Sequence, residues 1–235
     1  MFYVFLFVAV VLMLLLVSGG YVFFQACVRR KEYNWLSEEE IAGTSYGKYY
    51  KAILRSDSWL REHKAQDIYI TSKDNLKLHA LWIPARDVKG TIILAHGYKS
   101  TMLADFSYVL DFYHALGMNL LIPDQRSHGK SEGRYITFGV KESCDFASWI
   151  DYHNERFGNY PILLDGVSMG ASTVMYTADK KLPENVKGII ADCGFTSPWE
   201  ECKHVLKQNF NLPAFPPETQ QQTANEQFID RYGVH

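Results

Sequence analysis

From residue 90 onward the sequence alternates short apolar runs with longer amphipathic segments, and this alternation restricts the fold more than any other feature. The apolar runs are residues 90–97, 118–124, 160–168 and 186–194. The amphipathic segments with helical periodicity are residues 102–117, 139–158 and 169–180. Continuously apolar strands joined by helices predict an α/β fold with a mostly parallel sheet covered by helices on both faces. Functional side chains in such a sheet lie at the carboxyl ends of the strands.

Two further runs precede this alternation. Residues 67–72 ("DIYITS") and 76–84 ("LKLHALWIP") flank the turn-rich tripeptide Lys73-Asp74-Asn75. Strand-like runs separated by a short polar connection predict an antiparallel hairpin.

The N-terminal segment is uncharged and apolar from Phe2 to Phe24. About twenty such residues cross the hydrocarbon core of a bilayer as a helix. A cleaved signal peptide is the rival interpretation, but it requires a basic residue before a short apolar run. None precedes this run, so we predict a membrane anchor, with Tyr21, Phe23 and Phe24 near the interface. Basic residues 29–31 follow the run, which predicts a single-pass protein with its soluble part in the cytoplasm.

Composition limits the remaining possibilities. The chain has 235 residues and a formal net charge of −2, which suits one folded domain and lacks the basic surface of a nucleic-acid binder. The four cysteines form no C-x-x-C pair, so we predict no metal site. No dinucleotide-binding or Walker pattern is present, and we predict no cofactor. The sequence does not indicate which oligomeric state the protein has.

A G-x-S-x-G pattern, Gly166 to Gly170, lies where a predicted strand meets a predicted helix. At such a turn the two glycines let the backbone pass without Cβ clashes, and the helix N-terminus favours negative charge near Ser168. This is the setting of a nucleophile elbow. We therefore predict Ser168 as a catalytic nucleophile.

The run "ILAHGYKS" ends an earlier strand at His96-Gly97 and supports this prediction. An oxyanion hole needs two backbone N–H groups aimed at one point. We predict that the N–H groups of Tyr98 and Met169 form it.

The loop "PDQRSHGKSEG" (123–133) follows the next strand. Its Asp124, Arg126 and His128 are interpreted as a polar network that supports the neighbouring loops. Polar side chains in a loop of this kind usually order their own backbone, so His128 is not taken as the catalytic base.

Four pieces, "LAHGY", "DQRSHGKSEG", "DGVSMGAS" and "IIADCGFTSP", occur in the order and spacing of the α/β-hydrolase superfamily. The chain resembles its membrane-anchored bacterial branch, which is similar to serine aminopeptidase-like and dienelactone hydrolase-like proteins, over about residues 66–216. The resemblance implies hydrolysis of an ester, thioester or amide bond in a small acyl substrate or peptide, through a serine acyl-enzyme. The resulting division is an anchor (1–26), a helical linker (27–64), an incomplete hydrolase domain (65–216) and a polar, disordered tail (217–235).

The resemblance also implies an acid and a histidine after Ser168, on strands that follow the "ADCG" run. We find one helix and a glutamine-rich tail there, and expect the last two strands to be missing because the chain is truncated or frame-shifted. Asp192 is a weak candidate for the acid. His204 is interpreted as a solvated helix residue and His235 as the end of a frayed tail. No catalytic histidine is found, so we expect impaired activity.

Two other functions stay open. The first is a catalytically inactive hydrolase-fold protein that binds a ligand or belongs to an assembly. The second is a membrane-tethered scaffold that uses the aromatic residues Tyr46, Tyr49 and Tyr50, although aromatic stripes are more often packing surfaces.

Overall fold

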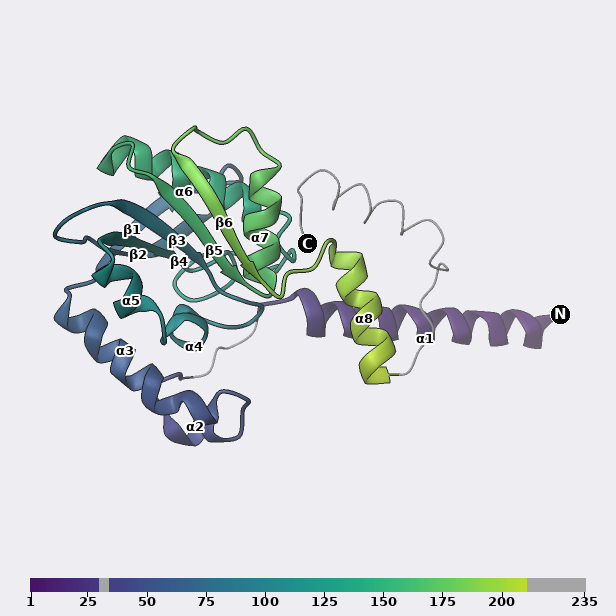
Figure 1. Cartoon of the computed structure of the whole chain (residues 1–235). Helices are drawn as coiled ribbons and strands as arrows, with labels where there is room; N and C mark the ends of the chain where they lie inside the picture. Colours follow the sequence, from purple (N-terminus) through teal and green to yellow (C-terminus); the bar gives the residue numbers. More distant parts are fainter. Residues whose placement is uncertain (30–33, 211–235) are drawn as a thin grey trace.

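The computed structural model describes residues 1–29 and 34–210 (Figure 1). The helices are α1 (Phe2–Cys27), α2 (Glu38–Ala42), η1 (Gly47–Tyr49), α3 (Tyr50–Glu62), α4 (Met102–Phe106), α5 (Leu110–Ala115), α6 (Glu142–Phe157), α7 (Met169–Ala178) and α8 (Pro198–Phe210). The strands are β1 (Gln66–Thr71), β2 (Lys77–Ile83), β3 (Gly90–Ala95), β4 (Met118–Pro123), β5 (Ile162–Val167) and β6 (Val186–Asp192).

The strands form one mixed sheet in the order β1-β2-β4-β3-β5-β6. β1 and β2 are the predicted antiparallel hairpin, and β2 pairs antiparallel with β4. The β4–β3, β3–β5 and β5–β6 pairs are parallel, so the predicted parallel sheet is confirmed. β6 lies at one edge of the sheet, and its Ile190 side chain is 44% exposed.

The sheet separates two hydrophobic cores because alternate residues of a strand point to opposite faces. In β3, Ile93 and Ala95 pack in one core with side chains of α6 and α7. Ile92 and Leu94 pack in the other core with side chains of α3, α4 and α5. Helices therefore cover both faces of the sheet, as Figure 1 shows.

The single helix predicted over 102–117 is wrong, because the segment forms α4 and α5 with a turn between them. The Ser107 carbonyl, which would continue the helix, instead accepts a hydrogen bond from the buried Ser56 hydroxyl of α3 at 2.6 Å. A tertiary contact thus interrupts a periodic sequence.

The segment between the anchor and the sheet packs on the domain. Trp35, Ile41 and Ile53 form a third hydrophobic cluster with Ala104 of α4. Tyr46 is partly buried against this cluster and its hydroxyl donates to Asp105 Oδ1 at 3.2 Å. The predicted helical linker is therefore helical, and part of its aromatic surface is a packing surface. The exact boundaries of the domain remain a prediction.

Helix α1 has 26 residues, an 18-residue stretch of it has a mean hydropathy of 2.8, and none of its residues is buried. By length and composition it is able to cross a membrane, and a signal sequence has the same properties.

Candidate active site

Ser168 occupies a strained turn between β5 and α7. Its backbone angles are φ 55° and ψ −118°, a conformation that side-chain-bearing residues rarely adopt and that costs about 1–3 kcal/mol. The Ser168 N–H donates to the Asp192 carbonyl at 2.8 Å, which fixes the turn to the end of β6. The Ser168 side chain is exposed, whereas the following Met169 and Gly170 are buried. The turn thus presents one hydroxyl to solvent from a rigid support.

The two glycines of the motif are required because three backbone segments meet here. A methyl group on Gly166 would overlap the Gly170 carbonyl, and one on Gly170 would overlap the Ala95 carbonyl at the end of β3. The first turn of α7 therefore lies directly against β3 and β5. Its N–H groups, including that of Met169, have no acceptor within the helix and point toward the carboxyl edge of the sheet.

The loop after β3 lies beside Ser168. A methyl group on Gly97 would lie 3.4 Å from Ser168 Cβ, so the two turns are in contact distance of each other. The Gly97 N–H donates to Asp105 Oδ2 at 2.7 Å. The same carboxylate accepts the Ser100 hydroxyl at 2.8 Å, and α4 thereby holds both ends of the loop that carries Tyr98.

His96 and Gln125 connect this loop to the loop after β4. The Gln125 N–H donates to His96 Nε2 at 3.1 Å, so His96 Nδ1 carries the proton that it donates to the Gly97 carbonyl at 2.9 Å. The Gln125 side chain donates to the His96 carbonyl and accepts the Thr173 hydroxyl of α7 at 2.9 Å. Both nitrogens of the His96 ring are therefore used to hold backbone.

His128 has the same structural role, in agreement with its interpretation as a loop residue. The Lys99 N–H donates to His128 Nε2 at 3.1 Å, and His128 Nδ1 donates to the Arg126 carbonyl at 3.0 Å. Burial, together with the neighbouring His96, lowers the pKa of His128 to about 3. No imidazole of the described residues hydrogen-bonds to the Ser168 hydroxyl.

Asp124 and Arg126 form separate ionic contacts on the hairpin side of this loop. Asp124 Oδ2 accepts from His79 Nδ1 at 2.7 Å, and His79 Nε2 contacts Asp67 at 2.6 Å. Arg126 makes bidentate contacts with Asp145 of α6 and with Asp74 in the hairpin turn, at 2.7–3.0 Å. The predicted polar network exists, and it fastens the loop to β1, β2 and α6.

The candidate acid and the other histidines do not form a triad with Ser168 in the described residues. Asp192 ends β6 next to the Ser168 turn, but its side chain is exposed and accepts the Cys193 thiol at 3.1 Å. His204 is exposed on α8, as predicted. His235 lies outside the described residues.

Three groups near the site were not found from the sequence. Asp105 holds the Gly97 loop, but its position in an amphipathic segment is no different from that of Asp111. Asp165 in β5 is buried and accepts the Tyr113 hydroxyl at 2.8 Å, and burial raises its pKa. His79 occupies an ordinary strand position. For two of the three groups the sequence held one signal: Asp165 and His79 are polar residues within apolar runs.

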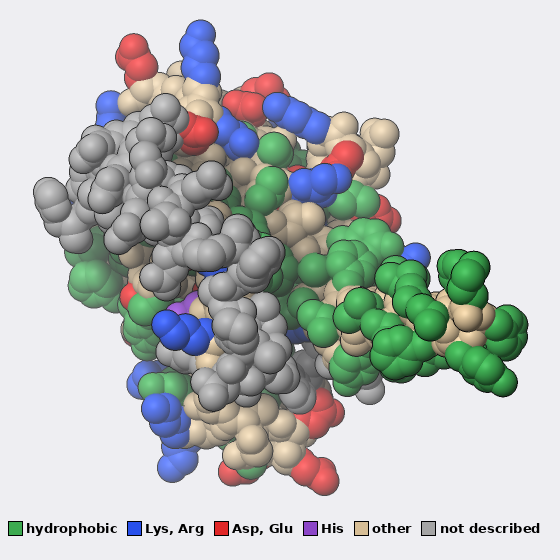
Figure 2. Space-filling view, turned by 90° about the vertical axis from the view of Figure 1, so that its right-hand side faces the viewer, with side chains coloured by type: hydrophobic (Ala, Val, Ile, Leu, Met, Phe, Trp, Pro, Cys, Tyr) green, Lys and Arg blue, Asp and Glu red, His purple; other side chains and the backbone are tan. Residues whose placement is uncertain are grey.

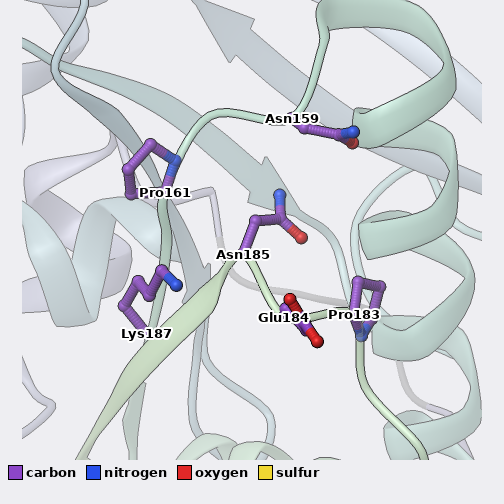
Figure 3. A pocket seen from close by; sticks show the side chains of 6 residues that line it. All are labelled: Asn159, Pro161, Pro183, Glu184, Asn185 and Lys187. Atoms are coloured by element: carbon purple, nitrogen blue, oxygen red, sulfur yellow. The ribbon is translucent and has the colours of Figure 1, made fainter.

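An open cavity of about 380 Å³ lies at the amino ends of β5 and β6, opposite the carboxyl edge of the sheet. Its lining residues precede or begin β5 and β6, as Figure 3 shows; they are Asn159, Pro161, Pro183, Glu184, Asn185 and Lys187. Ser168 follows β5, so this cavity is separate from the candidate active site. In the described part of the chain no group of three or more His, Cys, Asp or Glu is placed to hold a metal ion.

A mixed sheet with helices on both faces and a serine on the turn after β5 defines the chain as an α/β-hydrolase-fold protein. A family model described as serine aminopeptidase, S33, matches residues 86–228. The match covers more than half of the chain, which therefore belongs to this family.

Individual proteins and solved structures are also similar to this chain. An uncharacterized protein of Bacillus subtilis, YqkD, is 29% identical over 135 residues, which are 57% of this chain and 44% of the relative. The esterase Pf2001 of Pyrococcus furiosus has a TM-score of 0.57 and 25% identity over 75% of this chain and 65% of its own. The α/β-hydrolase GrgF of Penicillium sp. sh18, at 18% identity and a TM-score of 0.52, covers 73% of this chain and shares the fold. The chain spans less than two thirds of the length of each of the first two.

His128 is buried in its neutral form, so we expect the free energy of unfolding to fall as the pH is lowered through the mildly acidic range. An unfolded histidine has a pKa near 6.5, so the unfolded chain binds a proton that folded His128, with a pKa of about 3, does not. The contribution of His128 should therefore lower the free energy of unfolding by about 1.4 kcal/mol for each unit by which the pH falls below 6.5. Buried His153, whose pKa is also lowered, acts in the same direction.

Urea unfolding of the detergent-solubilised chain between pH 7.5 and 4.5 measures this slope. The variant His128→Gln keeps one acceptor and one donor and should have a shallower slope by about one proton. An equal slope in the two chains would show that His128 is not buried in its neutral form.

Proposed function

We propose that the chain is a membrane-anchored serine hydrolase that cleaves ester, thioester or amide bonds through an acyl-enzyme on Ser168. The observation that carries the proposal is the exposed Ser168 hydroxyl on a strained turn, with the Gly97 loop in contact distance. In the proposed reaction Ser168 Oγ bonds to the substrate acyl carbon, and the alcohol, thiol or amine leaves with the seryl proton. Water then releases the acid and restores the hydroxyl. The esterase activity named for the Pyrococcus relative favours esters.

The proposed oxyanion hole consists of the N–H groups of Tyr98 and Met169. It is supported by the position of Met169 at the N-terminus of α7, where N–H groups and the helix dipole favour an oxyanion. Asp105 supports it by holding the loop of Tyr98 from the preceding residue, Gly97. A preorganised site of this kind stabilises the tetrahedral intermediate whichever group serves as base.

The membrane part of the proposal rests on α1. This uncharged and mostly apolar helix of 26 residues is followed by Arg29, Arg30 and Lys31, which favour a cytoplasmic position for the domain. The substrate class proposed is a small acyl compound or peptide, with no cofactor.

A catalytically inactive hydrolase-fold binding protein is the second candidate. It is favoured by the His96 and His128 rings, whose nitrogens are all engaged with backbone groups. Without a base the hydroxyl of Ser168 would be a poor nucleophile and only a low rate would be expected.

A fluorophosphonate probe decides between the two candidates. The probe phosphorus bonds to an activated serine oxygen and fluoride leaves, so it needs no knowledge of the substrate. With carbonate-washed membranes that contain the whole chain, we expect labelling that is lost in Ser168→Ala and kept in Ser148→Ala. Ser148 is a suitable control because its hydroxyl contacts only the Cys144 carbonyl of its own helix. Absence of labelling in a chain that resists proteolysis would reject the hydrolase in favour of the binding protein.

A further inference from the structure

The end of α1 is attached to the loop that follows β4. The Ile136 N–H donates to the Cys27 carbonyl at 2.7 Å, and the Arg29 N–H donates to the Arg134 carbonyl at 2.8 Å. Between them Val28 forms an antiparallel bridge with Tyr135. The chain therefore leaves the apolar helix as an extended segment fixed to the domain by an isolated β-bridge, and not as a free tether.

Side chains from the candidate active site complete this attachment. The Tyr98 hydroxyl donates to the Ala26 carbonyl at 2.6 Å, and Lys99 Nζ donates to the Gln25 carbonyl at 2.6 Å. These carbonyls belong to the last turn of α1, where they lack partners within the helix and a cation is favourable. From the other side Arg29 donates to the carbonyls of Gly129 and Ser131 at 2.5 and 2.6 Å.

The rest of α1 stands away from the domain. Figure 1 shows it projecting from the carboxyl edge of the sheet, and in Figure 2 its side chains form a mostly green projection. A helix of 26 residues is about 39 Å long, whereas the hydrocarbon core of a bilayer is about 30 Å thick. If α1 crosses a bilayer, its last turn therefore lies at the interface, together with Tyr98 and Lys99, which bind that turn.

Ser168 lies on this same edge, because Gly97, the residue before Tyr98, is in contact distance of Ser168. Helix α8 (Pro198–Phe210) follows the carboxyl end of β6, and its Trp199 side chain is 45% exposed. An exposed tryptophan and an amphipathic helix are suited to the headgroup region of a bilayer.

We propose that the carboxyl edge of the sheet, where Ser168 lies, rests on the bilayer surface and that the acyl substrate of Ser168 enters from the bilayer. This inference rests on the proposed function, since it requires α1 to be a retained span and Ser168 to be the reacting group. The proposed substrate of Ser168 is a membrane-partitioned amphiphile with an acyl ester, such as a lipid, and not a water-soluble ester.

Depth measurements on the whole chain in neutral phosphatidylcholine vesicles test the orientation without any need for catalysis. Cys193, exposed at the carboxyl end of β6, receives a fluorophore in a chain whose other cysteines are replaced by alanine. The control places the fluorophore at Glu184→Cys, at the opposite edge, in a chain that also carries Cys193→Ala. The two edges are separated by the length of β5, about 20 Å.

With a nitroxide on the lipid headgroup, we expect several-fold stronger quenching at position 193 than at position 184. The variant Arg29→Ala, which loses the hydrogen bonds to Gly129 and Ser131, should reduce this difference. Equal quenching at the two positions in the parent chain would overturn the orientation.

Two fluorophosphonates with the same reactive group, one with a short soluble chain and one with a long bilayer-partitioning chain, test the substrate class. We expect the long-chain probe to label Ser168 several-fold faster in vesicles, and Arg29→Ala to lower this preference. Equal labelling rates would overturn the proposed route from the bilayer. Absence of labelling by both probes would reject the proposed hydrolase and with it the bilayer substrate, while the quenching result would still decide the orientation.

Discussion

Replacement of Gly170 by alanine will lower the free energy of unfolding by more than about 4 kcal/mol. A methyl group at this position overlaps the Ala95 carbonyl and meets the His96 carbonyl oxygen at 2.7 Å. Both are backbone atoms at the end of a central strand, so no change of rotamer relieves the overlap. Domains of ordinary stability have about 5–15 kcal/mol in total, and a loss of this size leaves a large fraction of the chain unfolded.

Pulse proteolysis in urea, with the whole chain in mild detergent, measures this effect. Gly188→Ala in β6 is the matched control, because its new methyl group meets only the end of the Leu163 side chain at 3.3 Å. A flexible side chain can move, so we expect the control to remain within about 1 kcal/mol of the parent chain. An unchanged urea midpoint for Gly170→Ala would show that α7 does not approach β3 as closely as described.

The motif glycines illustrate what the sequence was able to predict. Gly166 and Gly170 are separated from Ser168 by one residue each, so the tight turn is encoded within five consecutive positions. The strand before the turn is equally local, since it is a continuous apolar run. The parallel arrangement followed from the helices between the strands, and the structure confirms it.

Contacts between distant segments were not predictable in this way. Nothing in the sequence indicates that Asp105 receives the Gly97 N–H, or that the Tyr98 hydroxyl reaches Ala26, because each pair depends on how separate elements pack. The same reason explains the break between α4 and α5, where the Ser56 hydroxyl of α3 donates a hydrogen bond to the Ser107 carbonyl. The base for Ser168 is a further example: a triad is defined by spatial contact, and the described residues supply none.

Arg126 was recognised from the sequence as part of a network, but its partners come from the structure. Its side chain is 5% exposed and forms a bidentate pair with Asp145, which is also 5% exposed, and a second pair with Asp74. Burial raises the pKa of Asp145, and the neighbouring guanidinium opposes that effect. Removal of Arg126 alone would leave a buried carboxylate without its counter-charge.

We therefore expect Arg126→Met to lower the free energy of unfolding at pH 8 by about 3–5 kcal/mol, measured by the same proteolysis. The exposed Arg61, paired with Asp57 on α3, is the control, and Arg61→Met should cost at most about 1 kcal/mol.

The direction of the pH dependence separates loss of charge pairing from loss of packing. In Arg126→Met the pKa of folded Asp145 should rise further above that of the unfolded chain, so folding favours the protonated acid. Its contribution to stability is then present at low pH and lost as the pH rises through the folded pKa, which makes the loss smaller at pH 5 than at pH 8. Adding Asp145→Asn removes the unpaired charge and should restore part of the lost stability, because the two sites are coupled. If the double variant is less stable than Arg126→Met at both pH values, the guanidinium acts mainly through packing and not as the counter-charge of Asp145.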